Sequence, residues 1–89
     1  MNVDISRAFV KDTAPFPKKF KLVIQAVINE IQIAKVPGEI RDCSKLKGAD
    51  DMYRIRRGVY RVTFQYNGAT ATLKRVLPRG HIYKKHNLK

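Results

Sequence analysis

Three stretches between residues 52 and 78 alternate apolar and polar side chains, the pattern of half-buried β-strands. The pattern predicts strands over Met52–Arg57, Val59–Tyr66 and Ala69–Val76, with Pro78 ending the last one. One face of the resulting sheet is expected to be apolar and to carry Tyr53, Ile55, Tyr60, Val62, Phe64, Ala71 and Leu73. The opposite face is expected to be polar and to carry Arg54, Arg56, Arg61, Thr63, Gln65, Thr72 and Lys74. Arg75 falls on the apolar side of this alternation, where a long side chain can snorkel to solvent.

The amino-terminal half predicts one strand and two helices. Residues 1–5 alternate as a strand does, and Ser6 is suited to cap a helix over residues 7–13. A longer helix is expected over residues 17–34, because apolar side chains recur there with a 3.6-residue period and Pro17 suits the first helical position. Residues 38–51 are expected to be mostly loop. We therefore predict a single α+β domain over residues 1–89, with an N-terminal strand and two helices packed on one face of a twisted antiparallel sheet of about four strands.

Two glycine turns predict how the strands pair. Asn67-Gly68 is a preferred two-residue hairpin turn, and closing the second hairpin there sets Arg61 opposite Lys74. Arg57-Gly58 can close the first hairpin in the same way, which sets Arg54 opposite Arg61. The three cations would then lie side by side, about 5 Å from one to the next. Because like charges in direct opposition lower stability, this row predicts a surface that binds a polyanion such as a string of phosphates.

The charge of the chain is concentrated in its second half. The 89 residues contain 19 Lys and Arg against 7 Asp and Glu, a formal charge of +12. Residues 1–44 carry 7 basic and 5 acidic residues, for +2, whereas residues 45–89 carry 12 and 2, for +10. Lys45 and Lys47, in the loop before the strands, belong to this basic half. Such a skew fits nucleic acid, an anionic membrane or an acidic protein as the partner.

The usual signatures of metal, cofactor and membrane chemistry are missing from the sequence. Cys43 is the only cysteine, which excludes an intramolecular disulfide and predicts a cytoplasmic location. One Cys and two His supply too few ligands for a zinc site, and there is no Walker or dinucleotide glycine loop. No apolar run approaches the ~20 residues of a spanning helix, and the first residues lack a signal-peptide core. We expect no metal, no cofactor and no membrane partner.

The carboxyl-terminal segment supplies candidate proton handlers beside the basic face. Metal-free RNA cleavage needs a base for the 2′-OH, a cation for the extra charge on phosphorus and an acid for the leaving 5′-oxygen. Arginine suits the second role, because its planar fork pairs two phosphate oxygens. Tyr83, His81 and His86 can handle protons, although Tyr83 can instead be an aromatic anchor and either histidine an ordinary surface residue. The residues alone therefore predict a sheet that binds RNA or another polyanion.

Three stretches together resemble the RelE/ParE superfamily of bacterial toxins from toxin–antitoxin pairs. They are the opening VDISRAFVKD, the central KLKGADDMYRIRRGVYRVTF and the closing LKRVLPRGHIY. The central stretch is the most specific, with a basic-Leu-basic-Gly loop, Tyr-Arg-Ile-Arg, a glycine turn and Tyr-Arg-Val. The resemblance covers nearly the whole chain and implies a compact α+β fold with the element order predicted above.

The resemblance also implies an activity and its residues. RelE-like members cut mRNA in the ribosomal A site without a metal, whereas ParE-like members inhibit DNA gyrase. Carried over by position, the RelE-like site corresponds to strand residues Arg54, Arg56 and Arg61, then Arg79 and Tyr83. Some members have lysines where this chain has Arg54 and Arg56, and many have an acidic residue where it has His81.

The predicted function is therefore that of a ribosome-dependent mRNA endoribonuclease, the toxin of a type II toxin–antitoxin system. Arg61 and Arg79 would stabilise charge on the scissile phosphate, and Tyr83 or His81 would help remove the 2′-OH proton. RNA-positioning residues would be Arg54, Arg56 and Lys74, with Lys45 and Lys47 adding attraction to ribosomal RNA. The expected partners are the ribosome, mRNA and a short acidic or amphipathic antitoxin, the toxin being monomeric alone and hetero-oligomeric with it. A ParE-like gyrase inhibitor and an inactive antitoxin-binding member are the alternatives.

Overall fold

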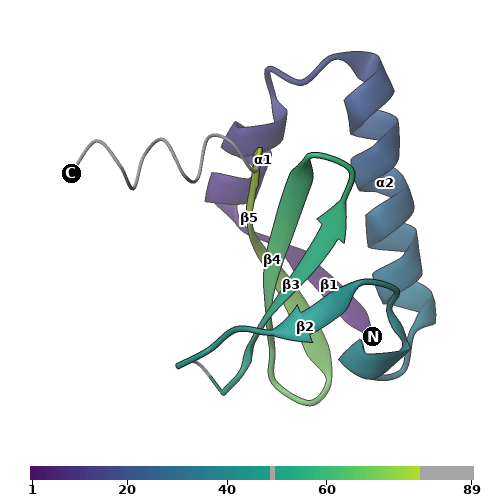
Figure 1. The fold of residues 1–89 in the computed structure, drawn as a ribbon, viewed down its shortest axis with the longest axis vertical. Helices are drawn as coiled ribbons and strands as arrows, with labels where there is room; N and C mark the ends of the chain where they lie inside the picture. The colour runs from purple at the N-terminus through teal and green to yellow at the C-terminus, as the bar shows by residue number, and fades with distance from the viewer. Residues whose placement is uncertain (49, 79–89) are drawn as a thin grey trace.

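Two helices pack against a five-stranded mixed sheet whose strand order is β1-β5-β4-β3-β2 (Figure 1). The computed structural model describes residues 1–48 and 50–78. The helices are α1 (Arg7–Thr13) and α2 (Lys18–Ile33), with a 3-10 turn, η1 (Pro37–Glu39). The strands are β1 (Asn2–Ile5), β2 (Cys43–Lys45), β3 (Met52–Arg57), β4 (Tyr60–Tyr66) and β5 (Thr70–Pro78). The predicted α+β class is confirmed.

The two edge strands are where the predicted sheet differs from the structure. β1 pairs parallel to β5, with Val3 opposite Ala71, so the sheet is mixed rather than antiparallel. A parallel pair requires a long crossover, which α1 and α2 supply here. β2 lies in the region predicted as loop, and it pairs with β3. Its three residues are too few to show an alternating pattern, so the sequence predicted about four strands and the structure has five.

The helix boundaries follow the sequence signals closely. Ser6 caps α1 as predicted, since its Oγ accepts a hydrogen bond from the Phe9 N–H at 3.2 Å. The same hydroxyl donates to the Lys74 carbonyl at 3.1 Å and so ties the start of α1 to β5. Pro17 is the N-cap of α2 rather than its first helical residue, a difference of one position.

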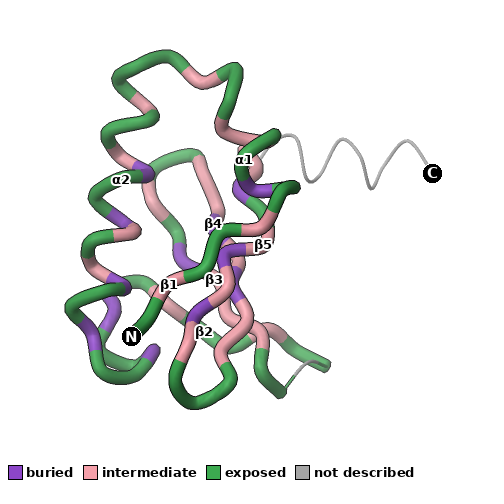
Figure 2. The backbone as a smooth tube through the Cα atoms, turned by 180° about the vertical axis from the view of Figure 1, so that it is seen from behind, coloured by how far each residue is buried: buried purple, intermediate pink, exposed green. Residues whose placement is uncertain are grey.

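The core lies between the helices and the apolar face of the sheet (Figure 2). The helices contribute Phe9, Ile24, Val27 and Ile31, and the sheet contributes Ile55, Val62, Phe64, Ala71, Leu73 and Val76. The predicted apolar face is therefore confirmed. Phe64 has no exposed surface, and truncating such a side chain to alanine costs about 3–5 kcal/mol of stability.

The first hairpin turns one residue later than predicted. Gly58-Val59 is the turn, with Gly58 at φ 58°, as the first central position of a type II′ turn requires. Arg56 consequently lies opposite Arg61, and Arg54 lies opposite Thr63. The predicted Arg54–Arg61 pairing is wrong, but a one-residue move of the turn shifts the register by two residues, so each side chain keeps its face.

The second hairpin also departs from the predicted register. Its loop is longer, because Tyr66 pairs with Ala71 and the Asn67 side chain accepts the backbone N–H groups of Ala69 and Thr70 at 2.9 and 2.8 Å. Gly68 takes a positive φ but Asn67 does not, so the turn is not the predicted two-residue type.

A β-bulge then separates the two halves of β5. Phe64 pairs with Leu73 and Thr63 with Arg75, which leaves Lys74 as the extra residue. Arg61 therefore lies opposite Leu77, and the predicted Arg61–Lys74 pairing is wrong. The bulge also moves Arg75 to the face of Thr63 and brings Val76 into the core, which corrects the prediction that Arg75 lies on the apolar side.

Candidate functional site

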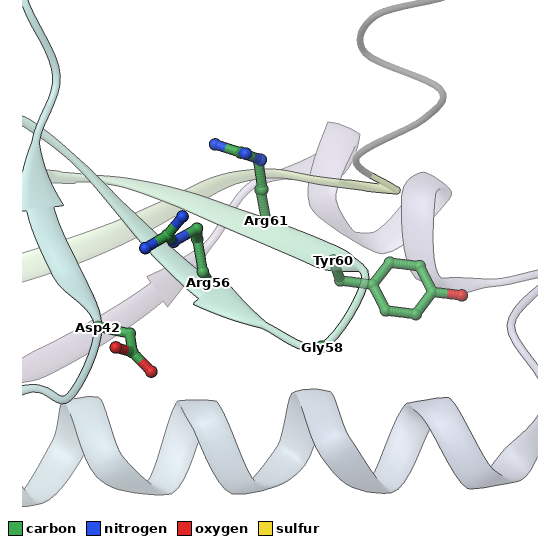
Figure 3. A pocket seen from close by; sticks show the side chains of 5 residues that line it. All are labelled: Asp42, Arg56, Gly58, Tyr60 and Arg61. Atoms are coloured by element: carbon green, nitrogen blue, oxygen red, sulfur yellow. The ribbon is translucent and has the colours of Figure 1, made fainter.

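Two arginines face each other on the polar side of the first hairpin. Arg56 of β3 and Arg61 of β4 are directly opposite in the register, and both side chains extend from the same side of the strands (Figure 3). Among residues 1–48 and 50–78, no carboxylate forms an ion pair with either of them. Opposed like charges without a counter-ion are unfavourable, so this pair has an unused capacity for an anion.

The arginine pair borders a hollow of about 260 Å³ at the tip of the hairpin. Its lining residues are Asp42, Arg56, Gly58, Tyr60 and Arg61 (Figure 3). The Tyr60 ring points away from the two guanidinium groups and packs on Phe16 and Phe20, with centroids at 4.7 and 5.2 Å. The polar lining therefore consists of two guanidinium groups and one carboxylate.

Asp42 enters the hollow from an unusual backbone conformation. It has φ 58°, and no other non-glycine residue among those described has a positive φ. Aspartate is one of the few residues that tolerates this region. The Asp42 carbonyl accepts the Arg56 N–H at 3.2 Å, which ties the segment before β2 to β3. Asp42 lies in the region predicted as loop and was not among the predicted site residues, because nothing in the local sequence indicates that this loop meets the hairpin.

Arg57 organises this end of the sheet from the core side. Its side chain is only 9% exposed and pairs with Glu30 of α2. It also donates to the carbonyls of Arg41 and Arg56 at 2.8 Å each, and its Nη1 lies 4.0 Å from the Asp42 carboxylate. Arg57 was predicted to be part of the hairpin turn. The two-residue period that places Ile55 in the core also places Arg57 on that face, and this signal could have found it.

The remaining strand and loop cations lie outside the lining of the hollow. Arg54 is opposite Thr63 and Ser44, one row away from the Arg56–Arg61 pair. Lys74 is the extra residue of the bulge. The Lys45 Nζ lies 5.7 Å from the centroid of the Tyr53 ring, and Lys47 is exposed in the turn after β2. The predicted row of Arg54, Arg61 and Lys74 is thus replaced by one arginine pair with flanking cations.

The predicted tail residues Arg79, His81, Tyr83 and His86 lie outside the described residues. The described chain ends at Pro78, which is opposite Tyr60 in the register, next to Arg61. Arg79 is the next residue along the chain.

Two other groups have perturbed proton affinities. Burial raises the pKa of the Cys43 thiol, with the neighbouring Arg57 acting in the opposite direction. Cys43 is therefore a poor nucleophile, as its small, half-buried position suggests. The hydrogen bond to Asp12 raises the pKa of the Arg75 guanidinium. Asp12 accepts from Arg75 Nε at 2.7 Å, from Arg75 Nη2 at 3.0 Å and from the Val76 N–H at 3.0 Å, so it joins α1 to β5.

Within the described residues, no group of three or more His, Cys, Asp or Glu side chains is arranged to hold a metal ion. The helices described are also too short or too polar to cross a membrane.

Comparisons with known proteins place the chain in a family. No protein-family model matches it. The toxin RelE3 of Methanocaldococcus jannaschii is 37% identical over 84 residues, covering 93% of this chain and 96% of the relative. The chain belongs to the RelE family of toxins.

Solved structures of RelE proteins agree with this assignment. The RelE chain of a RelB–RelE antitoxin–toxin complex from Methanococcus jannaschii superimposes with a TM-score of 0.79 at 34% identity, covering 92% of this chain and 96% of that one. A RelE–RelB complex from Pyrococcus horikoshii OT3 matches with a TM-score of 0.73 at 30% identity, covering 89% and 94%. The Pyrococcus complex is archaeal, so the family is not confined to bacteria.

Membership supports the predicted class of activity. This protein is a RelE-type toxin of a type II toxin–antitoxin system, and the known activity of RelE supports a ribonuclease role for it.

Proposed function

We propose that this RelE-family toxin cuts mRNA on the ribosome without a metal ion, leaving a 2′,3′-cyclic phosphate and a 5′-OH. The observation that carries the proposal is the Arg56–Arg61 pair, which faces a hollow and lacks an acidic partner among the described residues. A scissile phosphate bound between the two guanidinium groups would neutralise their repulsion. Each arginine can pair two phosphate oxygens at once, and Arg54 extends the binding surface by one row.

The proposed reaction is an in-line displacement at phosphorus. The 2′-oxygen attacks the phosphorus as its proton passes to a base, and the bond from phosphorus to the 5′-oxygen breaks as that oxygen takes a proton. Arg61 stabilises the charge that develops on the phosphoryl oxygens. Arg56 and Arg54 hold the RNA backbone.

The groups proposed to transfer protons belong to the carboxyl-terminal residues after Pro78. Tyr83 acts as the base or orients the 2′-OH, and His81 is the alternative residue for this role. Arg79 would add a second cation to the phosphate. Pro78 is the last described residue of β5 and lies opposite Tyr60, which lines the hollow. This position of Pro78 supports a catalytic role for the residues that follow Pro78 in the sequence. Lys74, Lys45 and Lys47 supply attraction to RNA over a wider area.

The proposed protein partner is a cognate antitoxin. Two of the similar RelE structures are complexes with RelB. On this chain a second hollow of about 220 Å³ lies between α1 and α2 and is lined largely by apolar side chains, among them Ile5, Val10 and Ile28. Val10 is 55% exposed, and Lys21 stands in the same lining. An amphipathic antitoxin helix with an acidic residue facing Lys21 fits this combination.

The test is a cleavage assay with purified ribosomes and a defined mRNA, run beside a gyrase supercoiling assay. We expect cleavage only when the ribosome is present, unaffected by EDTA at concentrations that leave ribosomes intact, with products that carry cyclic phosphate ends. Inhibition of supercoiling with intact mRNA would support the ParE-like alternative instead. Inactivity in both assays, with retained antitoxin binding, would identify an inactive member.

A further inference from the structure

The hollow at the hairpin tip is lined by residues of both charges, with the Asp42 side chain extending toward α2 and the two arginines away from it (Figure 3). Arg56 and Arg61 supply two guanidinium groups, and Asp42 supplies a carboxylate that forms no ion pair with either of them. The Asp42 side chain is 57% exposed, and the only cation recorded within 4.0 Å of it, among the described residues, is Arg57. The carboxylate therefore keeps most of its acceptor capacity for a ligand.

This polarity orients any nucleotide that enters. A phosphate is attracted to the arginine pair and repelled from Asp42, so the groups that meet the carboxylate must be hydrogen-bond donors. Gly58 lines the hollow without a side chain, so space remains for a planar group.

The chemistry of the four bases selects among possible donors. Guanine presents two adjacent donors, N1–H and the N2 amino group, on its Watson–Crick edge, and these match the two oxygens of a carboxylate. Adenine, cytosine and uracil each place an acceptor beside their donor, so a carboxylate gains one hydrogen bond at most and meets a repelling lone pair. Proteins read unpaired RNA bases through such edges.

We propose that the hollow holds one nucleotide of the substrate, with its phosphate on Arg56 and Arg61 and a guanine base on the Asp42 carboxylate, so that Asp42 sets the base preference of the toxin. The inference rests on the proposed function for its biological meaning, because it identifies the nucleotide that this same site reads. Arg57 supports the arrangement by holding the Arg41 carbonyl beside β3. The positive φ of Asp42 is then part of the binding geometry, since strained residues are concentrated at functional sites.

Direct binding tests the inference without the ribosome. The full chain is titrated with guanosine, adenosine, cytidine and uridine 5′-monophosphates while backbone amide shifts are followed by NMR. We expect the guanosine nucleotide to bind most tightly, by roughly 5- to 150-fold, the range that one bidentate contact supplies. The shifted amides should be those of Asp42, Arg56, Gly58 and Arg61. Equal affinity for the four nucleotides, or shifts elsewhere on the sheet, would overturn the inference.

The decisive variant is Asp42→Asn, because asparagine tolerates a positive φ and has almost the same shape. Its amide places a donor where guanine also has donors, so the guanine preference should disappear both in binding and in the ratio of mRNA cuts at guanine to cuts elsewhere. Asp4→Asn, on β1 at the opposite edge of the sheet, removes the same charge and should leave the ratio unchanged. An unchanged preference in Asp42→Asn would refute the inference. Selective guanosine binding by a toxin that cuts no mRNA would refute the proposed ribonuclease function and leave the nucleotide site standing.

Discussion

Arg56 and Arg61 stand directly opposite each other on β3 and β4, with a hollow beside them and no acidic partner in the described part of the chain. A cross-strand pair of like charges lowers stability. Since the pair also borders a hollow, we expect the two cations to serve binding rather than folding.

Replacing Arg61 should therefore separate activity from stability. We expect Arg61→Ala to reduce the single-turnover cleavage rate by about 10²–10³-fold, the usual loss when a donor to a developing anion is removed. The melting temperature should stay level or rise, because the repulsion from Arg56 is relieved. Arg7→Ala, an exposed arginine on α1, is the matched control and should keep full cleavage. A clear drop in melting temperature for Arg61→Ala would contradict this assignment.

Arg57 should behave in the opposite way. Its buried side chain pairs with Glu30 and donates to the carbonyls of Arg41 and Arg56. We expect Arg57→Ala to lower the free energy of unfolding by about 1–3 kcal/mol, since it leaves acceptors without their donor. Denaturant unfolding measures the change, with the exposed Arg56→Ala as the comparison, expected within about 0.5 kcal/mol of the parent protein. Equal effects of the two substitutions would show that the core-side contacts contribute little.

The tail is tested by removing a single hydroxyl group. If Tyr83 is the base or orients the 2′-OH, Tyr83→Phe should lower the single-turnover rate by about 10²-fold or more with ribosome affinity nearly unchanged. If Tyr83 is an anchor, Phe is tolerated and His81→Gln becomes the damaging change. A histidine base must be neutral to accept a proton, so activity would then fall as the pH drops through about 6.5, the reference pKa of histidine. Full activity in both variants would remove the tail from the mechanism.

The antitoxin surface is tested on the helix side of the molecule. Val10→Asp places a charge in the apolar hollow between α1 and α2 and should weaken antitoxin binding by about 10-fold or more, while mRNA cleavage by the free toxin continues. Leu22→Asp, at an exposed apolar position of α2 outside the lining of that hollow, is the control. Antitoxin affinity should also fall with added salt, but less steeply than RNA affinity, because apolar contact supplies part of the binding. Undiminished binding by Val10→Asp would place the antitoxin elsewhere.

Asp12 is expected to be a structural residue. Its carboxylate accepts hydrogen bonds from the Arg75 side chain and from the Val76 N–H, on the part of β5 that extends beyond its pairing with β1. We predict that Asp12→Ala lowers the free energy of unfolding by about 1–3 kcal/mol, because the backbone donor loses its partner. Asp4→Ala, an exposed residue of β1, should change it by less than about 0.5 kcal/mol in the same denaturation experiment.

Local patterns predicted most of the fold. The Ser6 cap, the helix over residues 7–13 and the strand Met52–Arg57 have the predicted bounds, and the apolar face of the sheet is as expected. The sequence predicted that Arg54, Arg56 and Arg61 share one cationic face of the sheet, but it did not predict which of them lie opposite each other. Asp42 and Arg57 were missed because their roles depend on contacts between segments that are distant along the chain.

The sequence by itself determined which residues form strands and helices and which face of each meets the core, because the periods of 2 and 3.6 residues are local properties of the backbone. Only the tertiary structure decided which cations stand together. A turn placed one residue later moved Arg61 from Arg54 to Arg56, and the bulge at Lys74 removed that lysine from the row. Register and bulges depend on the packing of the whole sheet against α1 and α2, and the parallel pairing of β1 with β5 joins segments nearly 70 residues apart. The hollow lined by Asp42 and the two arginines forms only when this register and these long-range pairings are in place.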